Sequence, residues 1–540
     1  MHLQPPELVE RGHVVRNTKG KPMALTDKKL NALRQKITEG LRIQRDTNEP
    51  VPYIDAANVV GDVCAKQNHT IFARRGCGKT LLLHYSTKLL AKSKTRSIYL
   101  NCEDFKRHSF PNVLIEILDA LFRELERHLT GWFGKDKKSR ELIQKIRKDL
   151  LNLRKAADVQ EESIRQTSST EKGQSVDAGG TAKLAAADLK FGVNKFGKQK
   201  EETERSYKLR SEKLRELDIW LPRLKEQVRE FFERSSSVNA VFLQIDDLYH
   251  LKKSDQPFVI DYLHRLCKDL PLYFKIATLR HASSLYMDLD GQPIGAQERH
   301  DYQPINIDYS FADFGRTRDQ NQKILYEFGK ATGISAADIN GLFKGAGFDR
   351  LVMAGGGVPR DTLSLFLEVL GNVKSQGGDK IGKDDVRLMS KSNFEKRIAE
   401  LKQDSEGGEQ DVLMRGIYVI REFCLSKNTN AFLISEKTLQ QDDEFKILIY
   451  RLLDYRIIHS AASALTHKSQ PGTFQAFLID IGCYAHLRKL EGRFTELDIS
   501  EPDAKDRLRS APILEVSEFE TLFTTSPGNV ENALMLEMNA

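Results

Sequence analysis

The apolar positions of residues 50–310 fall into short runs that are separated by longer segments with helical spacing. A run such as "VFLQIDD" (241–247), which is apolar except at Gln244 and ends in two carboxylates, predicts a buried strand. Apolar residues recur on one face of "KTLLLHYSTKLLAK" (79–92), which predicts a helix. This alternation predicts an α/β fold with a parallel sheet. The expected strands are "HTIFA" (69–73), "TRSIYLNCEDF" (95–105), "VNAVFLQIDD" (238–247), "LPLYFKIATLRHASSLY" (270–286) and "DYQPINIDY" (301–309).

The segment between the first strand and the helix at 79–92 has the composition of a phosphate-binding loop, or P-loop. Such a loop wraps phosphates with backbone N–H groups and ends in Gly-Lys-Ser/Thr at a helix start. Here Gly78 allows close backbone approach, Lys79 is expected to neutralise phosphates, and Thr80 is expected to hold Mg²⁺. Ala73 stands where the first glycine of such a loop is usual, so a basic turn capped by glycine is the alternative. The predicted nucleotide-binding residues are Ala73, Arg74, Arg75, Gly76, Cys77, Gly78, Lys79 and Thr80.

Two carboxylates, Asp246 and Asp247, follow the buried strand at 238–245. At the carboxyl end of a parallel strand they are expected beside the P-loop, with Asp246 as a Mg²⁺ ligand and Asp247 orienting the attacking water. A helix N-cap is the alternative for an isolated Asp-Asp pair. The preceding strand and the Gly-Lys-Thr loop upstream favour a catalytic role.

Two later segments carry polar residues that could reach a γ-phosphate. The strand at 270–286 ends in Thr278 and Arg280, and "MAGGGVPRDTLSLFLEVL" (353–370) places Arg360 on the first turn of a helix that Pro359 begins. A turn with a surface arginine is the alternative in each case. Thr278, Arg280 and Arg360 are predicted as catalytic residues together with Asp247.

The series "ARRGCGKT", "VFLQIDD", "KIATLRH" and "GGGVPRDTL" resembles the Walker A, Walker B, sensor 1 and sensor 2 motifs of AAA+ ATPases. It is most similar to the branch of origin-recognition and Cdc6-like ATPases and the related STAND ATPases. The resemblance covers roughly residues 50–375 and implies ATP and Mg²⁺ as ligands. Asp247 replaces the usual glutamate, which implies slow hydrolysis and suits a switch. An arginine finger is expected near the fifth strand, where Arg299 lies, although a surface arginine explains that residue equally well.

The rest of the chain divides into further units. Two charged helical segments at 139–166 and 201–235 have the periodicity of an antiparallel hairpin, and the tip between them is rich in Gly, Ser, Ala and Lys. Three helical pieces and a hairpin with a Pro-Gly turn predict a winged helix. Its third helix carries Lys446 and Arg451, which could contact DNA, but packing is the favoured role of this helix. The expected parts are an N-terminal helical extension (1–50), a P-loop ATPase core (51–315) with a helical insertion (about 125–235), a helical lid (316–375), a winged-helix domain (380–495) and a tail (496–540) that could dock on a partner.

Composition and net charge limit the class of protein but do not identify a binding partner. The 540 residues are 40% hydrophobic and 29% charged, and a net charge of +7 permits nucleic-acid binding without arguing for it. The six cysteines lack a C-x-x-C pair, so neither a zinc site nor a disulfide framework is suggested. A start without a secretion signal and the lack of a long apolar run predict a cytoplasmic protein with no membrane partner.

Two functions follow from the sequence. The first is an ATP-hydrolysing switch that acts as a homo-oligomer or through a separate effector protein, for which the STAND-like features imply a role in prokaryotic genome defence. The second is an ATP-dependent DNA-binding protein of the origin-recognition or transposition-regulator kind. A degenerate nucleotide binder with a scaffolding role is a third, weaker interpretation.

Overall fold

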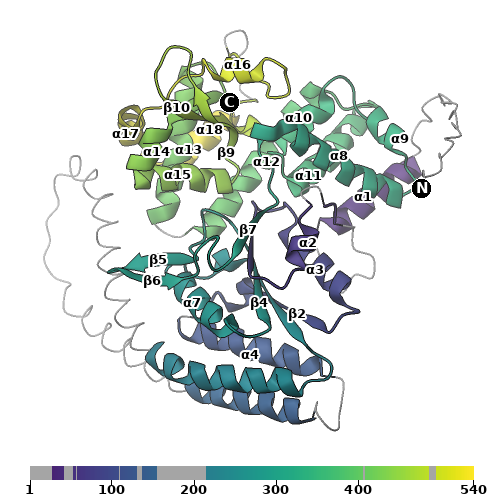
Figure 1. Ribbon diagram of the computed structural model, residues 1–540. Helices are drawn as coiled ribbons and strands as arrows, with labels where there is room; N and C mark the ends of the chain where they lie inside the picture. The colour runs from purple at the N-terminus through teal and green to yellow at the C-terminus, as the bar shows by residue number, and fades with distance from the viewer. Residues whose placement is uncertain are drawn as a thin grey trace, which may run out of the picture.

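The structure is a computed structural model, and it describes eight stretches of the chain. These are residues 27–41, 53–55, 58–108, 110–129, 137–154, 214–405, 408–485 and 494–539. The expected tip of the helical insertion lies outside the described residues. Figure 1 shows the sheet of the core below, with the C-terminal unit and the lid above it.

A five-stranded parallel sheet forms the centre of the core, with the strand order β2-β3-β4-β1-β7. In this register Asn101 lies opposite Asp246, Asp246 opposite Ala277, and Phe72 opposite Thr278. The strands therefore end at one common edge, which confirms the predicted α/β class. Their bounds are β1 (His69–Phe72), β2 (Thr95–Asn101), β3 (Ala240–Asp246), β4 (Leu272–Thr278) and β7 (Gln303–Asn306).

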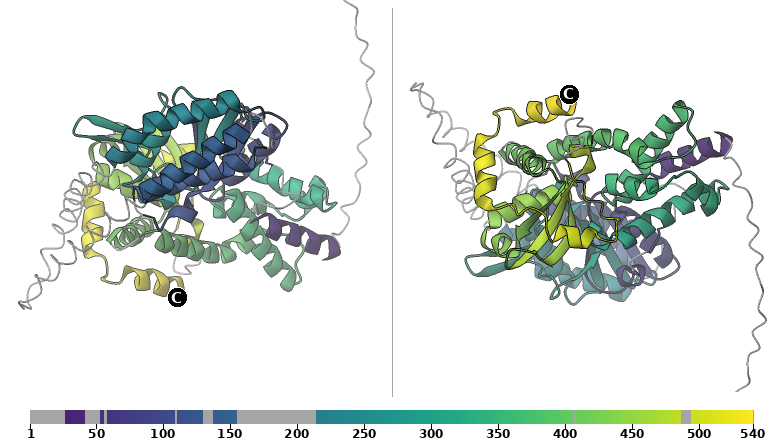
Figure 2. Two further views of the ribbon diagram at one scale, coloured as in Figure 1. Left: turned by 90° about the horizontal axis from the view of Figure 1, so that it is seen from below. Right: turned by 90° about the horizontal axis from the view of Figure 1, so that it is seen from above.

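Helices cover both faces of this sheet, as a parallel sheet requires. One face packs on α3 (Lys79–Leu90) and the short α2 (Val60–Val63), through Ile71, Leu82 and Leu83. The other packs on α4 (Asn112–Arg127), α7 (Gln256–Cys267) and two helical segments at 137–154 and 214–234. Figure 2 shows α4 and these segments on the side of the molecule that faces away from the C-terminal unit.

Two local features of the core lie beside the sheet. At the start of α2, the Asp55 carboxylate accepts the N–H groups of Val59 (2.8 Å) and Val60 (3.1 Å). A hairpin of β5 (Tyr286–Leu289) and β6 (Gln292–Gly295) follows β4, where the sequence suggested one continuing strand. Asp290 (φ 51°) and Gly291 (φ 78°) form its turn, in the left-handed conformation that two-residue hairpins favour.

The segment expected as a helical lid contains α8 (Phe314–Ala331), α9 (Ala336–Gly341), α10 (Gly347–Ala354) and α11 (Pro359–Ser375). The N-terminal helix α1 (Asp27–Gly40) packs against α8 and α11. Leu30, Leu33 and Ile37 are its buried residues, spaced three and four apart on one face. The described part of the expected N-terminal extension therefore packs against the segment expected as the lid.

The C-terminal unit begins with a long helix, α12 (Lys383–Asp404). The expected helices and hairpin are present, with an additional strand β8 that completes an antiparallel sheet of order β8-β10-β9. The assignment to the winged-helix fold stays a prediction. The remaining elements are α13 (Gly408–Ser426), β8 (Ala431–Ser435), α14 (Glu436–Gln441), α15 (Asp443–Asp454), β9 (Ile458–Thr466) and β10 (Thr473–Ile479).

The segment expected as a polar tail packs against this C-terminal unit instead. The backbone of Leu433 in β8 donates to Pro512 O and accepts from Leu514 N, both over 2.8 Å. Phe519 lies edge-on against Phe445 at a centroid distance of 5.1 Å. The tail contains α16 (Ala504–Leu508), α17 (Val516–Thr525) and α18 (Val530–Asn539).

In the stretches that the structure describes, four single turns of 3₁₀ helix connect these elements: η1 (Cys102–Phe105), η2 (Leu248–His250), η3 (Phe311–Asp313) and η4 (Ile481–Cys483). Among the described residues, no helix combines the length and the apolar character needed to cross a membrane.

Candidate nucleotide-binding site

The predicted phosphate-binding loop connects β1 to α3 at the common edge of the sheet. Gly76 (φ 84°) and Gly78 (φ 91°) both adopt backbone conformations that favour glycine, and Gly78 is the N-cap of α3. The helix then begins at Lys79, as the sequence predicts. The first N–H groups of a helix have no partner within it, so this loop and helix start have the local geometry of an anion-binding site.

The Gly-Lys-Thr end of the loop lies against the Asp-Asp end of β3. Thr80 Oγ1 donates a hydrogen bond to Asp246 Oδ2 over 2.5 Å, although the two residues are 166 positions apart. Tyr99 on β2 donates to the same oxygen over 2.8 Å, and the backbone N–H of Asp247 donates to Asp246 Oδ1 over 3.0 Å. The structure thus brings together the two segments on which the nucleotide-site prediction depends.

The Asp246 carboxyl is fully buried, and Asp247 beside it is partly exposed. Burial and the neighbouring Asp247 charge raise the pKa of Asp246, and hydrogen bonds from Thr80 and Tyr99 act in the opposite direction. A cation placed here would favour the ionised form. Asp247 has a φ of 54°, in the left-handed region that aspartate tolerates better than most residues.

Oxygen donors of this kind fit Mg²⁺. The Thr80 hydroxyl and the Asp246 carboxylate form the set, and Mg²⁺ in phosphate sites is commonly held by one or two carboxylates together with substrate phosphates. Over the described part of the chain, no group of three or more His, Cys, Asp or Glu is arranged to hold a metal ion by itself. The geometry therefore suits a cation that is bound together with a phosphorylated ligand.

Lys79 is buried beneath the loop. Its Nζ donates to the carbonyl oxygens of Ala73 (2.8 Å) and Arg74 (3.3 Å). Burial lowers the pKa of this ammonium group, and the Asp247 charge partly opposes that effect. An ammonium held at the base of the loop is positioned to face an anion bound there.

Arg74 fixes the loop to the core and the lid. Its Nε and Nη2 bind Asp308 Oδ2 (2.7 Å) and Oδ1 (2.8 Å), and its Nη1 donates to Gly356 O over 3.0 Å. Burial tends to raise the pKa of the Asp308 carboxyl, but Arg74 more than offsets this and holds the pKa below its usual range. This bidentate pair gives Arg74 an anchoring role in the loop.

Arg75 joins the loop to the C-terminal unit. Its Nη1 lies 2.6 Å from Asp404 Oδ2 at the end of α12, and the side chains of this pair are only 15% and 12% exposed. The guanidinium also packs over the ring of Tyr249 at 4.7 Å, and its Nε donates to the Tyr249 hydroxyl over 3.1 Å. Arg456 donates to the backbone carbonyl of Arg75 over 3.1 Å.

The start of α11 packs directly on the loop. The Arg360 N–H donates to Gly76 O over 3.3 Å, and a Cβ atom added at Gly76 would lie 2.8 Å from Arg360 Cβ and from Val358 Cγ1. The Arg360 guanidinium is 3.4 Å from Glu400 on α12, and Glu400 also pairs with Arg456. Arg360 is therefore close to the loop, with a carboxylate of the C-terminal unit as its partner.

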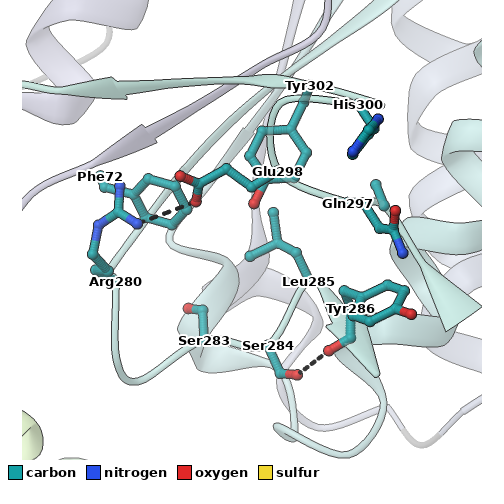
Figure 3. Close-up of a pocket in the computed structure, with 11 residues that line it drawn as sticks. Phe72, Arg280, Ser283, Ser284, Leu285, Tyr286, Gln297, Glu298, His300 and Tyr302 are labelled. Atoms are coloured by element: carbon teal, nitrogen blue, oxygen red, sulfur yellow. Dashed lines mark hydrogen bonds and ion pairs between the residues drawn. The ribbon is translucent and has the colours of Figure 1, made fainter. Parts of the chain in front are cut away.

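The side chains of Thr278 and Arg280, at the end of β4, have partners outside the loop. Thr278 is buried and its hydroxyl lies 2.5 Å from that of Ser283. Arg280 pairs with Glu298 over 3.2 Å and stacks on Phe72 at 4.1 Å, at one side of a cavity of about 440 Å³ (Figure 3). Segments 283–286 and 296–302 form most of its lining, which includes none of residues 73–80 or 246–247. The structure does not bring Arg280 to the loop.

Cys77 and Arg299 are the two remaining predicted residues. Cys77 is buried in the loop, and burial raises the pKa of its thiol. Arg299 is exposed, with a φ of 70°, and its N–H donates to Tyr302 O over 2.7 Å.

Sequence reasoning missed several residues that surround the loop. Tyr99 belongs to no motif, and strand alternation alone predicts only that it shares a face with Ser97 and Asn101. Asp308 lies two residues after the end of β7. Its place near the carboxyl end of a strand was therefore a usable signal. Asp404, Glu400 and Arg456 lie more than 300 residues from the loop, and no local pattern connects them to it.

Comparison with solved structures gives matches at low sequence identity. The Aeropyrum pernix ORC2 protein (ADPNP-ADP complexes) is 11% identical at a TM-score of 0.34, and the match covers 88% of this chain and 96% of that chain. Drosophila ORC bound to DNA is 13% identical at a TM-score of 0.32, covering 89% and 96%. The Walker-type ATPase PABY2304 of Pyrococcus abyssi is 12% identical at a TM-score of 0.33, covering 85% and 94%.

No model of a known protein family matches the sequence, and no curated protein matches it either. The α/β fold of this chain accordingly rests on its own strand order, and its candidate site rests on its own contacts.

Proposed function

We propose that the protein binds and slowly hydrolyses ATP with Mg²⁺, and that nucleotide binding changes the position of its C-terminal unit. The observation that carries the proposal is the 2.5 Å contact between Thr80 and Asp246. It places a Gly-Lys-Thr helix start and a carboxylate pair from a buried strand at one point on the sheet edge, as nucleotide hydrolysis requires.

Each residue of the site has a proposed role. The backbone around Gly78 and the Lys79 ammonium bind the phosphates, and Arg74 holds the loop in shape through Asp308. Thr80 and Asp246 hold Mg²⁺, which neutralises charge on the phosphates. Asp247 orients the attacking water, and its short side chain suits slow turnover.

The switch follows from contacts between the site and the C-terminal unit. Asp404 and Glu400 lie one turn apart on α12 and bind Arg75 and Arg360, the two guanidinium groups next to the loop. Phosphates are also strong partners for arginine, so a bound triphosphate competes with these carboxylates. Nucleotide binding and docking of α12 are then linked, because each changes the free energy of the other.

A third contact connects the C-terminal unit to the segment that follows β4. Asp454 at the end of α15 accepts the backbone N–H groups of His281 (3.1 Å) and Ala282 (2.9 Å), just after Thr278. The output of the switch, in this proposal, is oligomerisation or the recruitment of a separate effector protein by surfaces that the C-terminal unit covers or exposes. A role in prokaryotic genome defence is one setting for such a switch.

The test is ATP binding by the wild-type chain and by Lys79→Ala, measured by calorimetry with Mg²⁺. Loss of the ammonium should weaken ATP binding roughly 10- to 100-fold, since a hydrogen bond to a charged group contributes about 1.5–3 kcal/mol. Lys88→Ala is the matched control, because Lys88 is an exposed lysine on the same helix. Equal ATP binding by Lys79→Ala and Lys88→Ala would show that the nucleotide does not bind at this loop.

DNA binding controlled by ATP is the second candidate function. It is favoured by Lys138, Lys145 and Lys148, which are exposed on one side of the helical segment at 137–154. Lysines along one helix face can follow a phosphate backbone, and such binding weakens steeply with salt. Duplex DNA binding that strengthens with ATP and falls with salt would support this function, and no binding at low salt would exclude it.

A further inference from the structure

No sequence motif accounts for the hydrogen bond from Tyr99 to Asp246. Tyr99 lies in β2 opposite Gln244 of β3, so its side chain and those of Gln244 and Asp246 point to the same face of the sheet. Its hydroxyl donates to Asp246 Oδ2 over 2.8 Å. On this face its ring stacks on His84 of α3, at 4.7 Å between centroids and 30° between planes.

Three donors together fix the orientation of the Asp246 carboxylate. Oδ2 accepts from Thr80 and Tyr99, and Oδ1 accepts from the backbone N–H of Asp247. Thr80 and the backbone of Asp247 belong to the segments proposed to bind Mg²⁺ and water. Tyr99 comes from a different strand, where the sheet and the stacking on His84 hold it. Of the three donors, Tyr99 therefore lies outside the segments proposed to contact the ligand.

We propose that Tyr99 is the positioning residue of the Mg²⁺-binding carboxylate, keeping Asp246 turned toward Thr80. This inference rests on the proposed function. Residues that orient a metal ligand without contacting the metal typically change metal affinity by about 10- to 100-fold. A tyrosine hydroxyl that only satisfied a buried polar atom would affect stability and leave the metal dependence unchanged.

Tyr99→Phe removes the hydroxyl and keeps the ring that stacks on His84. The experiment measures binding of a fluorescent ATP analogue by the full chain while Mg²⁺ is titrated, and again in excess EDTA. Tyr273→Phe is the matched control, because Tyr273 lies in the same sheet but opposite Phe242, four residues before Asp246 in the register. Four positions along a strand correspond to about 13 Å.

The expected result is that Tyr99→Phe needs about tenfold more Mg²⁺ for half-maximal binding than the wild type does. Binding in EDTA should stay within about twofold of the wild type, and Tyr273→Phe should match the wild type under both conditions. A Mg²⁺ requirement for Tyr99→Phe equal to that of the wild type would overturn the inference. An equal loss of binding with and without Mg²⁺ would also overturn it, because Tyr99 would then support the loop and not the metal ligand.

The experiment separates failure of this inference from failure of the proposed function. If the wild-type chain itself shows no nucleotide binding at any Mg²⁺ concentration, the proposed function is wrong and the role of Tyr99 falls with it. If the wild type shows Mg²⁺-dependent binding, the comparison with Tyr99→Phe decides the inference alone.

Discussion

The ion pair between Arg75 and Asp404 provides the sharpest test of the link between the nucleotide loop and the C-terminal unit. Asp404→Asn removes the negative charge and keeps a side chain of nearly the same size. If α12 and the phosphates compete for Arg75, this change weakens the contact of α12 and leaves Arg75 available to the nucleotide. ATP should then bind more tightly to the variant than to the wild type.

The size of the effect follows from the surroundings of the pair. A hydrogen bond to a charged group contributes about 1.5–3 kcal/mol, and the two side chains here are 15% and 12% exposed. Burial raises the pKa of the Asp404 carboxyl although Arg75 lowers it, so the pair only partly offsets the cost of burying the charge. The lower end of the range, about 1.5 kcal/mol, is therefore appropriate, which corresponds to about tenfold in affinity.

The assay is a titration of each protein with a fluorescent ATP analogue at fixed Mg²⁺. Asp506→Asn serves as the control, because Asp506 is an exposed carboxylate that binds Lys468 within the C-terminal part of the chain. Asp404→Asn should bind the analogue about tenfold more tightly, and Asp506→Asn should bind it like the wild type. Unchanged or weaker binding by a folded Asp404→Asn protein would refute the competition between α12 and the phosphates.

Two further predictions concern the second carboxylate and the end of α15. Asp247→Ala should bind Mg²⁺ and ATP within about threefold of the wild type but release phosphate at least about 100-fold more slowly, because general-base groups contribute at least this much to the rate. Unchanged phosphate release would show that Asp247 takes no part in hydrolysis. Burial raises the pKa of Asp454 to about 6, above an unfolded value near 3.9. The folded protein therefore binds this proton more strongly than the unfolded chain does. Its free energy of unfolding should fall as the pH rises from about 4 to about 6. Asp454→Asn should flatten the Tm in this window, and a Tm profile identical to that of the wild type would contradict the assignment.

The predictable parts of the site are those that local sequence determines. A glycine at φ 91° before a helix that begins at Lys79 is a short-range requirement, and so is a buried strand that ends in two aspartates. Parallel strands place their carboxyl ends at one edge, so the contact between Thr80 and Asp246 follows once the strand order is known. The α/β class was predictable from the same periodicity.

The partners of the arginines could not be predicted, because they depend on how separate units pack. Arg74 and Arg75 fit the composition of a phosphate-binding loop, yet their guanidinium groups bind Asp308 and Asp404. Arg280 follows a strand that ends at the correct edge, but the hairpin after it places Glu298 within 3.2 Å. A charge pattern in sequence cannot distinguish a phosphate from a carboxylate as the partner of an arginine.

In the C-terminal unit, sequence composition also fails to predict how whole helices pack. The helix α11 extends to Ser375 and α12 begins at Lys383, so only seven residues connect the expected lid to the C-terminal unit. The polar composition after residue 496 suggested a tail. Its few apolar residues, among them Phe519 and Leu534, are sufficient to bury it against α13.

A structure of the protein with a non-hydrolysable ATP analogue and Mg²⁺ tests the central claim most directly. The account predicts that the phosphates lie within hydrogen-bond reach of the backbone N–H groups at 76–80, with the metal ion between the Thr80 hydroxyl and Asp246. A nucleotide bound elsewhere, for example in the cavity beside Arg280 and Glu298, with residues 73–80 and 246–247 making no contact to it, would contradict the account.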